Sequence, residues 1–301
     1  MIHLEREWNI AFATSDELPN VQIDDTFGGT SVASNKAMWE IKPRGTVVCG
    51  DLDEVLDDLS RLPVDTNNLD AAIVMFAAPT GMEKFLAEIK GLLPDIPICG
   101  AGASPDGDRS SEVFPSGDVS ILLIADSRYQ WKHEWKNLHT VLAEEISVIT
   151  ADSRTIEVVV DKGVKSNAKE WYHKECERLG CSGNEELSLI SPAGYNIHTS
   201  FDGDRLHTGT DVSGDWLLKR GLLPKAMADR KVEEVLTEGN SLVFGCAGLF
   251  GLLSRMPLTK DNTLMGFFHG EVLTAEGMPR FANLMVSSLT IKESRNKNDE
   301  S

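Results

Sequence analysis

The residues best suited to chemistry lie near the carboxyl end of the chain, in the run His269-Gly270-Glu271, with Asn283 shortly after it. Glu271 follows an apolar segment, and the neighbouring glycine lets a ligand approach the backbone. A carboxylate in this position suits recognition of an amine or a hydroxyl group in an otherwise apolar pocket. A surface position or a role as structural hydrogen-bond acceptor would explain Glu271 equally well, and both alternatives stay open.

Two side chains are candidates for a nucleophile. Cys246 ends an apolar stretch beside Gly248, where a ligand could approach, although a buried cysteine more commonly acts as a small apolar residue. Ser104 does not fit the Gly-x-Ser-x-Gly elbow, because Asp106 stands where the second glycine is needed. No catalytic triad emerges, so we expect a protein that is not an enzyme.

Cofactor and metal motifs are weak. Gly100 and Gly102 follow an apolar stretch, but Pro105 replaces the third glycine of a dinucleotide-binding motif, which favours a simple tight turn. The acidic run from Asp106 departs from a calcium loop at its Gly and Glu positions. Four possible metal ligands have a spacing that fits no zinc pattern: His198, Asp202, Asp204 and His207. We therefore predict neither a metal nor a cofactor from these motifs.

Composition excludes several classes of protein. The 301 residues include 29 Lys or Arg and 47 Asp or Glu, a net charge of −18 that disfavours nucleic acid and anionic membranes as partners. The longest apolar run, residues 71–79, is too short to span a bilayer. Charged residues at positions 5–7 argue against a secretory leader. Five cysteines without a Cys-x-x-Cys pair favour a cytoplasmic location over a disulfide framework.

Hydrophobic periodicity predicts the main elements. Residues 71–77 and 96–101 are expected to form parallel strands joined by a right-handed crossover through a helix over residues 82–93, and residues 119–125 form another strand. On that helix Glu83 is assigned to the polar face. Further strands are expected at 155–160, 187–190, 241–246, 263–269 and 282–291. Helical runs are expected at 168–179, ended by Gly180, and at 226–236.

These elements indicate an α/β fold of two related strand-helix-strand-strand units, with mixed sheets flanked by helices. We expect one unit over residues 1–150, a second over residues 151–292, and a disordered tail over residues 293–301, which holds no aliphatic or aromatic side chain. In each unit the last two strands are expected to form a hairpin-like pair.

The carboxy-terminal half resembles the FIST domain family of sensory domains. The family has an apolar strand ending in a Cys-Ala-Gly-Arg-like signature, then Gly-Phe-x-x-x-Gly-Glu, then a strand opened by Asn. The corresponding runs here are Leu242-Val243-Phe244-Gly245-Cys246-Ala247-Gly248, Gly266-Phe267-Phe268-His269-Gly270-Glu271 and Phe281-Ala282-Asn283. A looser similarity around Gly100 and Gly102 extends the resemblance over residues 69–292.

The resemblance implies a cytoplasmic sensory protein that binds a small ligand, with amino acids or similar metabolites proposed as ligands for the family. The residues expected at the ligand are Gly100, Gly102, Cys246, Gly248, Gly266, His269, Gly270, Glu271 and Asn283. Leu249 stands where the family usually has Arg, which implies that the ligand is lost or changed. The shortened amino-terminal part leaves open whether the two-part pocket is complete. Since the chain carries no recognisable output domain, we expect it to signal to a separate protein partner.

Three alternatives remain. Some members of this family bind haem and respond to nitric oxide, and His269 beside two phenylalanines is then the expected axial ligand, followed by His198 and His207. The other two are an enzyme that acts through Cys246 and a protein-interaction module that binds no small ligand.

Overall fold

The computed structural model describes twelve segments of the chain, and the statements below concern these alone. They are residues 2–7, 23–24, 29–31, 43–62, 66–76, 82–93, 96–102, 119–181, 186–223, 240–246, 263–268 and 270–293. For residues 2–7, 23–24, 29–31 and 263–268, and for positions 202, 240 and 293, only the backbone is described.

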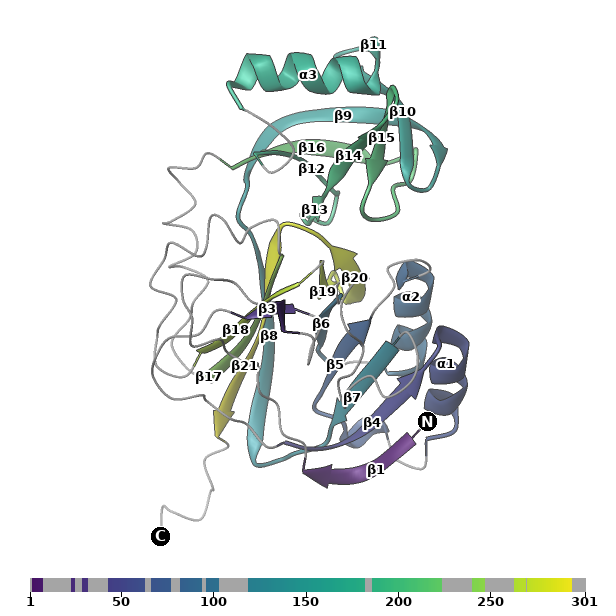
Figure 1. The fold of residues 1–301 in the computed structure, drawn as a ribbon, viewed down its shortest axis with the longest axis vertical. Coiled ribbons are helices and arrows are strands. Elements are labelled where there is room, and N and C mark those ends of the chain that lie inside the picture. Colours follow the sequence, from purple (N-terminus) through teal and green to yellow (C-terminus); the bar gives the residue numbers. More distant parts are fainter. Residues whose placement is uncertain are drawn as a thin grey trace.

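Three sheets dominate the described structure, and the helices are few (Figure 1). The expected mixed sheets with flanking helices are present, but the balance lies much further toward strand than the sequence predicted. Much of this excess comes from residues 129–222, where the sequence pattern predicted only a few strands.

The first sheet has the strand order β1-β4-β7-β5-β6-β19-β20. Its strands are β1 (Ile2–Glu7), β4 (Arg44–Gly50), β5 (Ala71–Phe76), β6 (Ile98–Gly102), β7 (Val119–Ile124), β19 (Glu271–Ala275) and β20 (Met278–Ala282). As predicted, β5 and β6 run parallel and are separated in sequence by α2 (Met82–Leu92). α1 (Leu52–Ser60) follows β4, and a capping box between Asp51 and Glu54 fixes its start. A short 3₁₀ helix, η1 (Thr66–Asn68), precedes β5.

The second sheet has the order β2-β3-β18-β17-β21-β8. Its strands are β2 (Ile23–Asp24), β3 (Gly29–Ser31), β8 (Tyr129–Asn137), β17 (Asn240–Cys246), β18 (Thr263–Phe268) and β21 (Met285–Glu293). β17 runs parallel to β18 and antiparallel to β21. β21 includes Glu293, the first residue of the predicted tail; residues 294–301 and the predicted helical run 226–236 lie outside the described segments.

The third sheet closes on itself. Its strands are β9 (Thr140–Asp152), β10 (Thr155–Asp161), β11 (Val164–Asn167), β12 (Leu187–Ile190), β13 (Asn196–Ile197), β14 (Thr199–Asp202), β15 (Arg205–Thr208) and β16 (Leu217–Leu222). The order β13-β12-β16-β9-β10-β15-β14 begins and ends on strands that only His198 separates in the chain. The two edges are therefore parts of one continuous segment, and we call this sheet the barrel. α3 (Ala168–Leu179) lies across it and ends at the predicted left-handed Gly180 (Figure 1).

The predicted hairpins are wrong. β6 and β7 do not pair with each other, because β5 lies between them. β18 and β21 likewise lie on opposite sides of β17. The hairpin in this region is instead β19–β20, which turns at Glu276-Gly277 and extends the first sheet beyond β6.

The sheets also cross the predicted division at residue 150. β8 precedes that position but pairs with β21, whereas β19 follows it but pairs with β6. β9 runs through the position without a break. Strands from both predicted units are therefore needed to complete the first two sheets.

Three apolar clusters hold these layers together. One packs α1 and α2 on one face of the first sheet, through residues such as Val55, Leu86 and Val74. A second packs the opposite face against the second sheet, where Ile73 and Phe244 belong to the same cluster. The third fills the barrel between α3 and the β19–β20 hairpin, from Trp171 to Leu273. Burial of these side chains supplies the main favourable free energy of folding.

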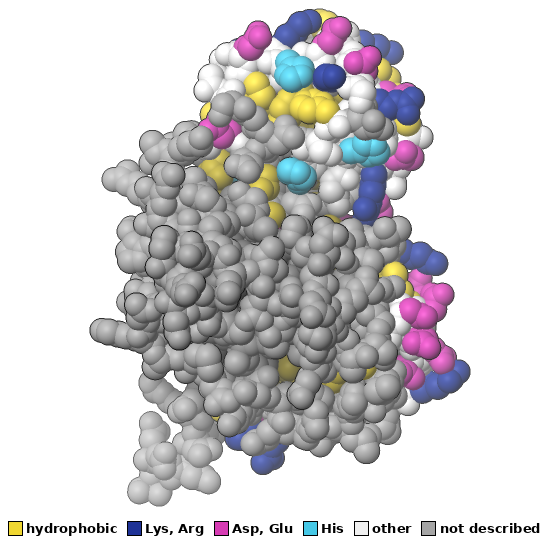
Figure 2. Space-filling model, in the orientation of Figure 1, with side chains coloured by type: hydrophobic (Ala, Val, Ile, Leu, Met, Phe, Trp, Pro, Cys, Tyr) yellow, Lys and Arg dark blue, Asp and Glu magenta, His cyan; other side chains and the backbone are white. Residues whose placement is uncertain are grey.

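The surface charge over the barrel is mixed. Figure 2 shows acidic and basic side chains interspersed over the barrel rather than gathered in one patch of a single sign. This distribution agrees with a net charge of −18 that serves solubility. Among the described helices, none has the length and apolar character required to span a membrane.

Candidate functional site

The candidate site lies where β6 meets β19. Ala101 is paired with Glu271 and Gly100 with Val272, and the N–H of Gly102 donates to the carbonyl of Gly270 over 3.0 Å. The strand ends predicted from the two halves of the chain are therefore neighbours in the first sheet.

Glu271 is the most unusual residue at this position. Its side chain is fully buried, and neither carboxyl oxygen has a hydrogen-bond partner of acceptable geometry among the described residues. Burial raises its pKa well above the ordinary value; the Met285 N–H and the Cys246 thiol, which face the carboxyl, offset this only in part. Burial therefore favours the protonated form of this carboxyl. A buried carboxyl without a partner is costly in free energy, which points to a role other than stability.

Cys246 brings the second sheet to the same place. It is the last residue of β17, is buried, and lies opposite Phe268 of β18 in the parallel pair. Its thiol faces the Glu271 carboxyl. A protonated carboxyl does not assist ionisation of a thiol as a basic group would, so this arrangement gives no support to Cys246 as a nucleophile.

Glycine is required at two of the predicted positions. Gly270 has φ +104°, and a Cβ there would lie 2.3 Å from the Phe281 ring and 2.8 Å from Asn283 Nδ2. Gly100 has φ +146°, and a Cβ there would lie 1.8 Å from the carbonyl oxygen of Val74. Both glycines thus permit close packing of strands, and Gly270 also brings Asn283 against the turn that precedes Glu271.

Asn283 provides a second buried polar group without a partner. It directly follows β20, and its Oδ1 is buried with no hydrogen-bond partner among the described residues. A Cβ on Gly209 would lie 2.3 Å from this oxygen, so Asn283 packs directly on the segment after β15. Asn283 therefore lies between the Gly270 turn and the barrel.

Some predicted site residues cannot be placed. Gly248 and His269 lie outside the described segments, as do Ser104, Asp106 and Leu249. Gly266 is described only through its backbone, which pairs with Phe244 on β17 and with Ser31 on β3. The haem alternative, which depends on His269, stays a prediction.

The two further histidines lie on the barrel. The His198 carbonyl accepts from the Gly209 N–H over 2.8 Å, which places His198 near Asn283. The His207 ring lies 3.5 Å from Thr155 Oγ1. Within the described segments, no cluster of three or more His, Cys, Asp or Glu residues could hold a metal ion.

Sequence reasoning misplaced Glu83. The helical pattern assigned it to the solvent face of α2, but its side chain is only 11% exposed because β20 covers it. Burial raises its pKa to about 7, opposed by Arg280, whose Nη1 lies 4.0 Å from Glu83 Oε2. The Phe281 N–H and Arg154 also lower this pKa, whereas Asp211 raises it. These groups belong to β20 and to turns of the barrel, so the sequence of α2 alone gave no sign of them.

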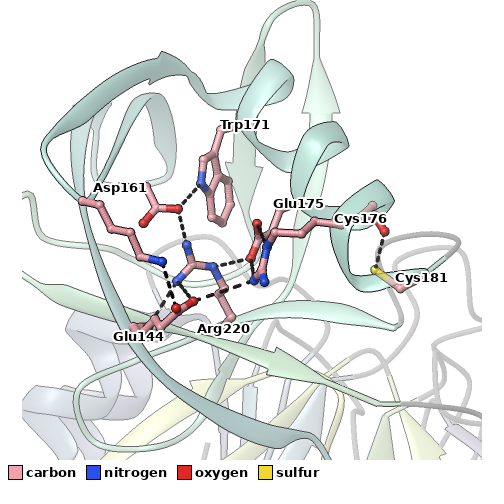
Figure 3. Close-up of polar contacts among 9 residues, drawn as sticks. Glu144, Asp161, Trp171, Glu175, Cys176, Cys181 and Arg220 are labelled. Atoms are coloured by element: carbon pink, nitrogen blue, oxygen red, sulfur yellow. Dashed lines mark hydrogen bonds and ion pairs between the residues drawn. The ribbon is translucent and has the colours of Figure 1, made fainter.

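A buried ion-pair network in the barrel was also missed (Figure 3). Arg220 on β16 is 1% exposed; its Nε lies 2.6 Å from Glu175 Oε1 on α3, and its Nη2 donates to Asp161 on β10. Its guanidinium also lies over the Trp171 ring, 5.5 Å from the centroid. Burial works to raise the pKa of Asp161, but hydrogen bonds from Arg220 and Trp171 hold it below the ordinary value. The network fixes α3 on the barrel and has no contact with Glu271 that the structure describes.

Comparison with known proteins adds no assignment. No protein-family model matches this chain, and a search of curated proteins finds no matching relative.

Proposed function

We propose that this protein is a FIST-like sensory protein that binds a small ligand at Glu271 and signals to a separate protein partner. The observation that carries the proposal is the Glu271 carboxyl, which is fully buried and has no hydrogen-bond partner among the described residues. Gly102 and Gly270, named by the resemblance in different halves of the chain, are joined beside it by a hydrogen bond. Neither nucleic acid nor a membrane is part of the proposal.

The arrangement around Glu271 favours a ligand with an amine. The Met285 N–H and the Cys246 thiol face the carboxyl and lower its pKa in part, and no described cation accompanies it. What the carboxylate form lacks is a compensating positive charge. A primary ammonium supplies that charge together with hydrogen-bond donors, and a charge-assisted hydrogen bond in a buried site is strong. Binding would then shift Glu271 to its ionised form and release its proton.

The pairing pattern supports two related units on either side of this site. In the first sheet β5 lies between a parallel neighbour, β6, and an antiparallel neighbour, β7. In the second sheet β17 lies between β18 and β21 with the same two orientations. We propose that β7-β5-β6 and β21-β17-β18 are copies of one unit. Glu271 lies between the ends of β6 and β17, at the carboxyl ends of parallel strands, where open α/β sheets bind ligands.

A thermal-shift screen tests the proposal. Standard amino acids and other small amines would be compared with their N-acetyl derivatives, which lack the ammonium. A ligand that binds the folded protein raises its melting temperature by mass action. We expect stabilisation by one or more free amines, none by the acetylated forms, and loss of the effect in Glu271→Gln.

The matched control is Glu276→Gln, which changes an exposed carboxylate in the turn of the same hairpin. It should retain the full ligand-induced shift. A shift that persists unchanged in Glu271→Gln would place the ligand elsewhere. Stabilisation by the acetylated forms alone would keep a ligand site but reject the amine.

A further inference from the structure

The end of α3 brings two cysteines together. Gly180 adopts φ 68°, which turns the chain back so that the Cys181 N–H donates to the Cys176 carbonyl over 3.1 Å. This closure is the Schellman motif, in which the two residues so joined usually also make an apolar side-chain contact. Here both positions hold thiols.

The Cys181 thiol also reaches back to Cys176. The Cys181 thiol donates to the Cys176 carbonyl oxygen over 3.7 Å (Figure 3), and each thiol shifts the pKa of the other. Both residues are partly exposed, whereas the three other cysteines, Cys49, Cys99 and Cys246, are buried. All five are free thiols in this structure. This pair is therefore the most accessible pair of cysteines, and the turn at Gly180 keeps its two members close.

Their surroundings distinguish the two sulfurs. Burial raises the pKa of both thiols, that of Cys176 to about 12. Their mutual hydrogen bond then acts in opposite directions, lowering the pKa of Cys181 and raising that of Cys176. Glu175, Glu186 and Tyr172 are the other titratable groups that face the pair. This difference favours Cys181 as the thiol that ionises first.

We propose that Cys176 and Cys181 form a reversible dithiol–disulfide site whose oxidant is a low-molecular-weight disulfide such as glutathione disulfide. The Cys181 thiolate attacks one sulfur of the oxidant, whose S–S bond breaks and releases one thiolate. Cys176 then loses its proton, attacks the Cys181 sulfur and expels the second thiolate. The protein loses two electrons and two protons, and the oxidant gains them as two thiols.

The bond would act on the helix end that carries Glu175. That residue directly precedes Cys176 and pairs with the buried Arg220 at 2.6 Å. A covalent link from Cys176 to Cys181 would restrict unwinding of the last turn of α3. The oxidised and reduced forms are therefore expected to differ in how firmly this turn is held on the barrel.

Peptide mass spectrometry of the full chain tests the site. Reduced protein is incubated with glutathione buffers of increasing oxidised fraction, quenched with acid, alkylated and digested with trypsin. Trypsin cuts after Arg178, which lies between the two cysteines, so the bridge joins two tryptic peptides that separate on reduction. We expect the joined peptides to accumulate while the peptides of Cys99 and Cys246 remain alkylated without oxidation.

Two single variants test the order of attack. Cys176→Ser retains Cys181 and should form a mixed disulfide with glutathione several-fold faster than Cys181→Ser, which retains Cys176. Cys99→Ser, which changes a buried thiol outside the pair, should form the bridge like the wild type. A wild-type protein that accumulates glutathione adducts without joined peptides would overturn the proposal. So would two thiols that stay reduced while the buried cysteines oxidise.

Discussion

The N–H of Gly102 donates to the carbonyl of Gly270 over 3.0 Å, which ties the last residue of β6 to the residue that precedes β19. This bond belongs to the ladder in which Ala101 faces Glu271. A carboxyl placed there is enclosed by the first sheet on one side and by the end of β17 on the other. Strands from the two halves of the chain therefore meet at Glu271, whose carboxyl oxygens have no hydrogen-bond partner among the described residues.

The first prediction concerns the pH dependence of stability through Glu271. Its pKa is raised in the folded protein, so folding takes up a proton once the pH exceeds the unfolded value of 4.5. Stability from this group is complete below that pH and is lost as the pH rises through the folded pKa. Glu271→Gln, which resembles the neutral acid, should therefore be more stable than wild type at pH 8 and similar at pH 4. Melting temperatures across this range measure the difference; wild-type and variant profiles that run parallel would contradict it.

A second pH effect is expected from Glu83. Its pKa rises from 4.5 to about 7 on folding, which corresponds to an upper limit of roughly 3 kcal/mol. Stability should fall between these two values as the pH rises, and Glu83→Gln should remove that fall. Glu88→Gln on the same helix is the control, since Glu88 is exposed beside Lys84. Denaturant unfolding at pH 5 and pH 8 separates the two variants, and equal pH profiles for them would exclude this role for Glu83.

The third prediction addresses the Arg220 network. Arg220→Met leaves the buried Glu175 without its cation, which typically costs about 3–5 kcal/mol. Arg205→Met breaks an exposed pair with Glu157 at 2.8 Å and should cost about 1 kcal/mol or less. Chemical denaturation compares the two. Similar losses in both variants would show that the buried network contributes no more than a surface ion pair.

The glycine turn before Glu271 supplies the fourth prediction. Gly270→Ala combines positive φ with a Cβ that would lie 2.3 Å from the Phe281 ring. Gly277→Ala, in the turn of the same hairpin, also has positive φ but meets nothing within 4 Å. The first variant should therefore be less stable than the second by about 1–3 kcal/mol, the usual cost of overpacking. Thermal unfolding of both measures this difference, and equal losses would mean that backbone conformation alone requires Gly270.

Local sequence patterns predicted several elements well. Periodicity predicted β5, α2 and β6. The two strands are buried along their whole length and the helix buries one face, and both kinds of burial leave a regular apolar pattern in the sequence. The end of α3 was predicted from Gly180, whose left-handed conformation is a local property. The grouping of Gly100, Gly102, Glu271 and Asn283 was predicted from a family resemblance rather than from pairing rules.

Strand pairing was the main failure. β6 and β7 are consecutive in the chain, yet β5 separates them, and β19 from the far end of the chain completes the sheet. The partner of an edge strand depends on how distant parts of the chain pack together. The sequence pattern of one strand does not specify which strand will pair with it. Glu83 was misassigned for the same reason, since its burial comes from β20 and not from its own helix.

The sequence by itself determined where apolar strands and helices form, where glycine must end or turn them, and which few polar residues stand out near the carboxyl end. Only the tertiary structure decided that Glu271 is fully buried, that Glu83 is covered, and that Arg220 lies among carboxylates. Periodicity and turn chemistry act over a few neighbouring residues. The burial and charge environment of a side chain is set by residues distant in the chain, through the free energy of packing whole sheets together.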